Sequence, residues 1–202
     1  CLVGSEMCIR DSVYLLRKPL PGDTKEMLLA RRAIFEQGMY EPLSNMLNTT
    51  IAAHLQAEHA AGSVRLFDAG CGEGYYLARL HDALLTPERS VISLGCDISK
   101  EAIRLAARRY PLSFFQVANI KDHLPLANNT LDVLLNIFAP RNTVEFARTL
   151  SPGGLLAVAI PGPQHILELR SALQLLAIEE QKEQHVIAQF TTPSEATAAP
   201  FT

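Results

Sequence analysis

The sequence predicts an α/β protein with a doubly wound parallel sheet, preceded by a helical segment. From residue 63 onward, short apolar segments alternate with amphipathic segments, which is the pattern of repeated βαβ units. The first apolar segment ends in FDAGCGEGYY (67–76), which carries glycines at every second position. Such a run is typical of a ligand-binding turn between a strand and a helix.

The expected strands are short and regularly spaced. Five of them are predicted, over residues 64–70, 90–98, 112–119, 130–138 and 153–161. Helices are expected between most of them, and Ser99 is the expected N-cap of one. Because each helix returns the chain for another parallel strand, the result is a doubly wound sheet. A further helix is expected after the fifth strand.

Ahead of the sheet, residues 23–62 are expected to form two helices joined by a turn that contains Tyr40. Asp23 or Thr24 is the expected N-cap of the first helix, and Gly38 is its expected C-terminal cap. Apolar residues of this helix are expected on one side, namely Met27, Leu28, Ala30, Ile34 and Phe35.

We divide the chain into four regions. Residues 1–12, CLVGSEMCIRDS, show no periodicity and resemble translated sequencing-adapter read-through, so the protein's own sequence is expected to begin near Val13. A helical segment follows over 13–62, and a ligand-binding α/β domain over 63–190. Residues 191–202, rich in Thr, Ala and Pro, form an expected flexible tail.

Composition argues against several function classes. The net charge of -3 gives no overall positive field, so a polyanion would have to meet a local basic patch. No apolar run reaches the roughly 18 to 20 residues that span a bilayer, so we expect a cytoplasmic location and no membrane partner. The four cysteines are Cys1, Cys8, Cys71 and Cys96. Their spacing does not match that of zinc ligands, so we expect no metal site in this chain.

The order of the glycines selects the ligand. A dinucleotide turn needs G-x-G-x-x-G, but Tyr75 stands where the third glycine would be, and no Gly-Lys-Ser or Gly-Lys-Thr of a phosphate loop follows. The pattern acid-x-Gly-x-Gly-x-Gly, Asp68 to Gly74, resembles the loop of class I S-adenosylmethionine-dependent methyltransferases. Gly70, Gly72 and Gly74 would let the backbone approach the methionine and ribose, and Asp68 would bind the ammonium group.

Two further polar residues follow expected strands at the same edge of the sheet. Asp97 ends the second strand, where a carboxylate can accept both ribose hydroxyls. Asn119 follows the third strand, where it can meet the adenine edge. The alternatives are that Asp97 assists the helix after Ser99 and that Asn119 is a turn residue. Together with the glycine loop, these residues favour a Rossmann-like class I methyltransferase sheet.

Segments on both sides of the glycine loop indicate a particular family of methyltransferases. The chain resembles the bacterial 23S ribosomal RNA guanine-N1-methyltransferases in four segments, PGDTKEMLLARRAIFEQGMYEPL (21–43), GCGEGYY (70–76), IFAP (137–140) and PGPQHILELR (161–170). This family methylates a hairpin loop of 23S rRNA, so the resemblance implies rRNA as partner and S-adenosylmethionine as cofactor. It also implies cofactor contacts from Tyr40, Gly72, Glu73 and His165.

The family also carries an N-terminal zinc module with four cysteine or histidine ligands. Cys1 and Cys8 do not match its spacing, so zinc is expected only in a module outside this chain. The closing C-terminal strands are not visible, and we expect the chain to be truncated at both ends. Five basic residues near the cofactor would meet RNA phosphates or form a solvated helix face: Arg17, Lys18, Lys25, Arg31 and Arg32.

Other questions stay open at this point. The NIFAP segment, Asn136 to Pro140, lacks the Asn/Asp-Pro-Pro-aromatic order of amino-methyltransferases, so Phe138 and Pro140 are expected to shape the pocket wall. Guanine N1 carries a proton that must leave, but the general base is unassigned. Two rival functions are a small-molecule methyltransferase and a non-catalytic cofactor-binding protein. A homodimer is left open.

Overall fold

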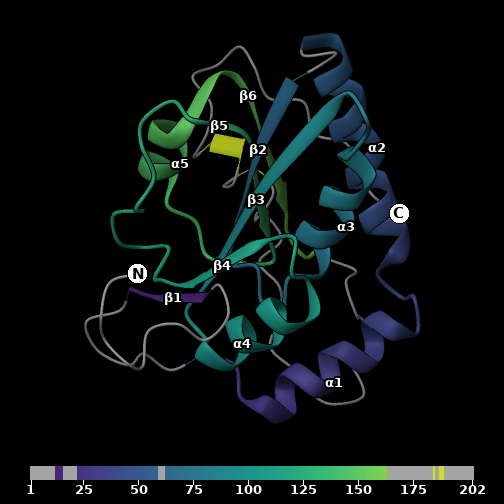
Figure 1. Ribbon diagram of the computed structural model, residues 1–202. Helices are drawn as coiled ribbons and strands as arrows, with labels where there is room; N and C mark the ends of the chain where they lie inside the picture. Colours follow the sequence, from purple (N-terminus) through teal and green to yellow (C-terminus); the bar gives the residue numbers. More distant parts are fainter. Residues whose placement is uncertain (1–11, 16–21, 59–61, 163–183, 185–186, 189–202) are drawn as a thin grey trace. The chain divides into compact units, whose positions relative to one another are not determined.

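The computed structural model describes residues 12–15, 22–58, 62–162, 184 and 187–188 (Figure 1). The chain divides into two compact units, residues 1–158 and 159–202. The fold and the site described below belong to the first unit. No helix among the described residues is long and apolar enough to cross a membrane.

A six-stranded sheet forms the centre of the first unit, with the order β1-β4-β3-β2-β5-β6 (Figure 1). The strands are β1 (Ser12–Tyr14), β2 (Gly62–Ala69), β3 (Arg89–Asp97), β4 (Phe114–Val117), β5 (Leu131–Ile137) and β6 (Leu150–Ala159). The pairs β1 with β4, β4 with β3, β3 with β2 and β2 with β5 are all parallel. The chain order reverses between β2 and β5, which is the switch point where ligands bind in open α/β sheets.

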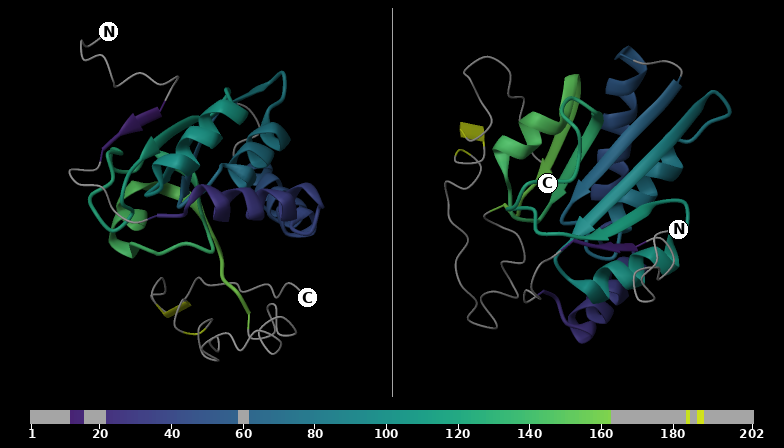
Figure 2. Two further views of the ribbon diagram at one scale, coloured as in Figure 1. Left: turned by 90° about the horizontal axis from the view of Figure 1, so that it is seen from below. Right: turned by 60° about the vertical axis from the view of Figure 1, so that its left-hand side comes forward.

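Five helices accompany the sheet: α1 (Lys25–Glu36), α2 (Glu41–Glu58), α3 (Tyr75–Leu84), α4 (Lys100–Arg109) and α5 (Thr143–Thr149). The helices α2 and α3 pack against each other on one face, and α5 lies on the opposite face (Figures 1 and 2). Since both faces are covered, β5 is buried at every position. Large buried side chains from both faces form the core, among them Phe67, Leu77, Phe115, Leu134 and Phe146.

The predicted fold class is confirmed. All five predicted strands are present, with boundaries that differ by a few residues, and Thr24 and Ser99 cap α1 and α4 by accepting from Met27 and Ala102 backbone N–H groups. The edge strand β1 was not predicted. The four predicted regions are not tested and stay predictions. The helix and tail predicted after the fifth strand lie outside the described residues, apart from residues 184 and 187–188, which are helical.

The apolar residues of α1 are unevenly buried. Leu28 is fully buried, whereas Met27 and Ile34 are 52% and 38% exposed. Unlike α3, this helix does not lie flat on the sheet. Polar contacts attach it instead, including the ion pairs of Arg32 with Glu73 and of Arg109 with Glu36.

Candidate functional site: the carboxyl ends of β2, β3 and β5

The glycine loop connects β2 to α3 in a conformation that side chains oppose. Gly70, Gly72 and Gly74 have φ angles of 88°, 53° and 83°, in the region that favours glycine. A Cβ atom on Gly70 would overlap the Cβ of Ala139, and one on Gly74 would lie 2.9 Å from Phe115 Cζ. The glycines are therefore needed both for the turn and for close packing.

Backbone and carboxylate groups fix this loop to the end of β3. The N–H groups of Gly70 and Cys71 both donate to the Cys96 carbonyl, each at 2.9 Å. The Gly72 N–H donates to Asp97 Oδ2 at 2.9 Å, and the Ser99 N–H donates to Asp97 Oδ1 at 2.8 Å. Asp97 thus joins the loop after β2 to the loop after β3. Burial raises its pKa, while these two hydrogen bonds act in the opposite direction.

Asp68, the next-to-last residue of β2, differs from Asp97 in its surroundings. Its side chain is 1% exposed, and its Oδ1 atom is buried without a hydrogen-bond donor from any residue that the structure describes. Burial, with a smaller effect of the nearby Asp97 carboxylate, raises the pKa of Asp68 to about 8. A buried carboxyl with an unused acceptor suits a cationic ligand group, which would supply both the missing charge and the missing donor.

An aromatic cluster borders the loop on the side of α1 and α2. The Phe35 ring stacks on Tyr75, with centroids 4.2 Å apart and planes 6° from parallel, and it meets Tyr40 and Tyr76 edge-on at 5.6 and 6.0 Å. Tyr40 in turn meets Phe138 edge-on at 6.1 Å. Tyr40 lies at the junction of α1 and α2, as predicted, and its ring also contacts the turn after β5. Its contact with the cofactor stays a prediction.

Ion pairs engage the side chains of Glu73 and two of the basic candidates. The Glu73 side chain is 2% exposed and accepts from Arg32 Nε and Nη2 at 2.9 and 2.7 Å. Arg31 pairs with Asp23 at 2.7 Å, and its Nη1 lies 3.5 Å from where a Cβ on Gly72 would be. The Arg32 pair therefore joins α1 to the glycine loop, whereas the Arg31 pair lies within the segment of α1.

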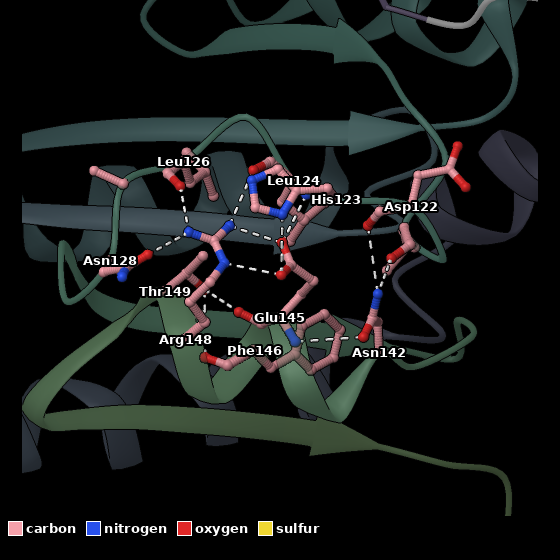
Figure 3. A network of polar contacts seen from close by, with 12 residues as sticks. Asp122, His123, Leu124, Leu126, Asn128, Asn142, Glu145, Phe146, Arg148 and Thr149 are labelled. Carbon is pink, nitrogen blue, oxygen red and sulfur yellow. Dashed lines mark hydrogen bonds and ion pairs between the residues drawn. The ribbon is translucent and has the colours of Figure 1, made fainter.

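Asn119 begins the loop between β4 and β5. Its Oδ1 accepts from the Lys121 N–H at 3.1 Å, which is the turn role considered as the alternative. The Asn142 side chain donates to the carbonyls of Ile120 and Asp122 at 3.0 and 3.4 Å (Figure 3). The loop after β4 is thus tied to the N-terminus of α5.

A second network, missed by the sequence analysis, completes this connection (Figure 3). Glu145 Oε2 accepts from the Leu124 N–H and from Arg148 Nη2, both at 2.7 Å, and Oε1 accepts from Arg148 Nε at 2.8 Å. Arg148 also donates to the Leu124 and Leu126 carbonyls at 3.0 and 2.7 Å. The Arg148 guanidinium and these hydrogen bonds lower the pKa of Glu145 to about 2.

Asn136 is another residue whose role the sequence analysis missed. It is fully buried near the end of β5, and its Nδ2 donates to the Ala69 carbonyl at 2.9 Å and to the Pro140 carbonyl at 2.8 Å. An amide inside the apolar segment LDVLLNI was the available signal, because a buried polar side chain requires partners.

The remaining predicted residues lie outside the part of the chain that the structure describes. These residues are His165, Arg17 and Lys18. Within the described part, no group of three or more His, Cys, Asp or Glu side chains is arranged to hold a metal ion.

Comparison with known proteins identifies the class that this site defines. Residues 66–154 match the model of a methyltransferase domain family. The solved structure of the DszA carbon methyltransferase resembles the chain with a TM-score of 0.50 and 19% identity, over 67% of this chain and 39% of that one, which concerns the fold alone. The fold and this match place residues 66–154 in a methyltransferase domain of the class I, S-adenosylmethionine-dependent type.

Within this class the chain is related to the 23S rRNA guanine-N1-methyltransferases. It is 39% identical over 91% of its length to the 23S rRNA (guanine(748)-N(1))-methyltransferase of Streptomyces fradiae, of which it covers 64%. It is 38% identical over 87% of its length to a putative 23S rRNA (guanine-N(1)-)-methyltransferase of Micromonospora griseorubida, of which it covers 61%. The chain thus spans about three fifths of the length of these relatives.

Proposed function

We propose that this chain is the cofactor-binding part of an enzyme that methylates guanine N1 in a 23S rRNA hairpin loop. One observation carries the choice of substrate. The likeness to the rRNA methyltransferases extends over 91% of the chain, whereas the general methyltransferase model matches only residues 66–154. The likeness therefore includes α1 and α2, which lie outside the residues that match the general domain.

The residues of the site suit S-adenosylmethionine. Asp68 offers an unused buried acceptor to the ammonium group, and a glycine backbone without side chains can approach a ligand closely. Both Asp97 oxygens accept a backbone N–H, but each carboxylate oxygen has a second lone pair for a ribose hydroxyl. We assign the loop of Asn119 to the adenine edge and Tyr40 to the wall of the site.

For Glu73, we assign the contact to the backbone, because Arg32 engages the side chain. His165 is proposed as a further contact on the strength of the family resemblance. When bound, the cofactor supplies an electrophilic methyl group on a sulfonium. The chain's own residues would position this group for in-line attack and exclude water. The group that removes the proton from guanine N1 stays unassigned.

The test is methyl transfer by the complete gene product. The protein would be incubated with labelled S-adenosylmethionine and 23S rRNA from a strain that lacks the modification, and the product mapped by mass spectrometry. We expect one N1-methylguanine in a hairpin loop. Gly72→Val is the matched loss-of-cofactor variant, because its φ of 53° disfavours a β-branched residue.

Three results would contradict the proposal. Label on small metabolites but not on RNA would indicate a small-molecule methyltransferase. Calorimetric binding of S-adenosylhomocysteine without transfer to any bacterial RNA or metabolite would indicate a non-catalytic protein. Normal cofactor binding by Gly72→Val would show that the loop has been assigned wrongly.

A further inference from the structure

Two buried side-chain oxygens beside the glycine loop have no hydrogen-bond partner among the described residues. One is Asp68 Oδ1 near the end of β2, and the other is the hydroxyl of Tyr76 in the first turn of α3. Asp68 is 1% exposed and Tyr76 is 9% exposed. Buried polar groups of folded proteins are nearly always hydrogen-bonded, so two unsatisfied groups beside one loop require an explanation.

The ring of Tyr76 is held in place by neighbouring rings. Phe35 and Tyr75 meet it edge-on, with centroid distances of 6.0 and 5.1 Å. Long side chains of a helix point back towards its N-terminus, which in α3 follows directly on the glycine loop. Burial raises the pKa of Tyr76, with smaller effects of two neighbouring tyrosines and of the Asp68 carboxylate. The Tyr76 hydroxyl therefore lies near Asp68 without forming a hydrogen bond to it.

The surroundings of the Tyr76 hydroxyl favour an anionic partner. No side chain among the described residues caps the first turn of α3, and the N–H groups of such a turn carry the positive end of the helix dipole. The two arginines beside the loop are engaged by acids, Arg31 by Asp23 and Arg32 by Glu73. A buried hydroxyl that can donate next to these N–H groups suits a carboxylate.

We infer that Tyr76 is a specificity-determining residue of the donor site, whose hydroxyl binds the carboxylate of the methionine part while Asp68 binds the ammonium group. The inference rests on the proposed function and names a further ligand contact within it. The ammonium and carboxylate groups of an amino acid are attached to one carbon, so a buried acceptor and a buried donor near each other suit both at once. Each unsatisfied oxygen then gains its partner, and the site selects a donor that carries the carboxylate.

The test removes the hydroxyl from the protein and the carboxylate from the ligand. Calorimetry on the complete gene product measures the affinity for S-adenosylhomocysteine and for its decarboxylated form, which keeps the amine. Tyr76→Phe removes only the hydroxyl and retains the ring that packs on Phe35. Tyr75→Phe is the matched control, because Tyr75 is less buried and its hydroxyl lies near Arg79 and Glu41. The melting temperature of each ligand-free protein is measured as well.

We expect the unmodified protein to bind decarboxylated S-adenosylhomocysteine roughly 10- to 150-fold more weakly than S-adenosylhomocysteine, the loss expected for a charged hydrogen bond. Tyr76→Phe should lower the affinity for S-adenosylhomocysteine by a similar factor and should bind the two ligands about equally, because the same hydrogen bond is removed from either side. Tyr75→Phe should keep both affinities within about 2-fold. Asp68→Asn should weaken both ligands by the same factor, since both carry the ammonium group.

Two results would overturn the role of Tyr76 while leaving the proposed function intact. The first is a Tyr76→Phe protein that keeps the full preference for the ligand with the carboxylate, because the hydroxyl would then serve the fold and not the ligand. The second is equal affinity of the unmodified protein for the two ligands. Absence of any S-adenosylhomocysteine binding by the unmodified protein would instead refute the cofactor assignment of the proposed function, and the role of Tyr76 with it.

Discussion

Two buried acids, Glu145 in α5 and Asp68 in β2, differ in how they are satisfied. Glu145 accepts hydrogen bonds from the Leu124 N–H and from two nitrogens of Arg148, and its pKa is lowered to about 2 (Figure 3). Asp68 is more deeply buried and has an unused Oδ1, and its pKa is raised to about 8. The same functional group is therefore stabilised as an anion in one place and disfavoured as an anion in the other.

The difference separates an acid that is satisfied within the fold from the acid that we propose to bind a ligand. Glu145 has its donors and its counter-ion within the fold, so it can fix the loop after β4 without any ligand. Asp68 has no donor to Oδ1 and no cationic partner within the described chain. Its charged form would therefore be stabilised by a cationic group of a ligand. Three measurements test this contrast.

The largest expected effect is on stability. Glu145→Gln removes the anion but leaves Arg148 in place, and we expect the free energy of unfolding to fall by about 3 kcal/mol at pH 7. Because the folded pKa is below the ordinary value of 4.5, this stabilisation is present above pH 4.5 and is lost as the pH falls towards about 2. Urea unfolding of both proteins at several pH values measures the difference.

Glu101→Gln is the matched control for this substitution. Glu101 also pairs with an arginine three residues later, Arg104, but its side chain is 43% exposed. We expect a change below about 0.5 kcal/mol, as for other exposed pairs. Equal effects of the two substitutions on the free energy of unfolding would show that Glu145 contributes no more to stability than an exposed ion pair.

The second effect concerns binding. Asp68→Asn should weaken the affinity for S-adenosylhomocysteine by roughly 10- to 150-fold, the loss expected for a charged hydrogen bond. The ligand-free variant should nevertheless be more stable than the unmodified protein at pH 8, because it buries no charge. Asp82→Asn, on an exposed part of α3, is the control. If Asp68→Asn lowers both the affinity and the melting temperature, the residue supports the fold rather than a ligand.

The smallest effect is a pH dependence. With its pKa raised to about 8, Asp68 is protonated in the ligand-free protein at lower pH and must lose this proton to bind an ammonium group. The affinity should therefore rise by up to about tenfold per pH unit between roughly pH 5.5 and 7.5. Calorimetry in buffers of different ionisation enthalpy should detect about one released proton at pH 7, and none with Asp68→Asn. A pH-independent affinity would contradict the assignment.

Local patterns in the sequence predicted the sheet and the glycine loop. Gly70, Gly72 and Gly74 were predicted in this turn because their spacing is local and follows a predicted strand, and all three adopt positive φ. The hydrogen bond of Asp97 to the Gly72 N–H was not predicted. The Glu145 network could not be predicted in this way. Its partner Leu124 lies 21 residues away in the chain, and a Glu in a short helix gives no local sign of burial.

For the first helix, the sequence predicted which residues share a side but not which of them are buried. Periodicity predicted that the apolar residues share one side, but their burial differs: Met27 is 52% exposed, whereas Leu28 is buried and Phe35 stacks on Tyr75. Amphipathic spacing identifies which side of a helix is apolar. It does not identify whether another element covers that side within the described chain.

The packing of the glycine loop also restricts which substitutions this sequence can accept during evolution. A Cβ on Gly95 would lie 2.8 Å from the Sγ atom of Cys71, which is buried against β3. A single change to alanine at Gly95 would displace the thiol, and a larger residue at Cys71 would meet the same backbone. Among homologous sequences, we therefore expect the two positions to vary together, with a larger residue at position 95 accompanied by a smaller one at position 71.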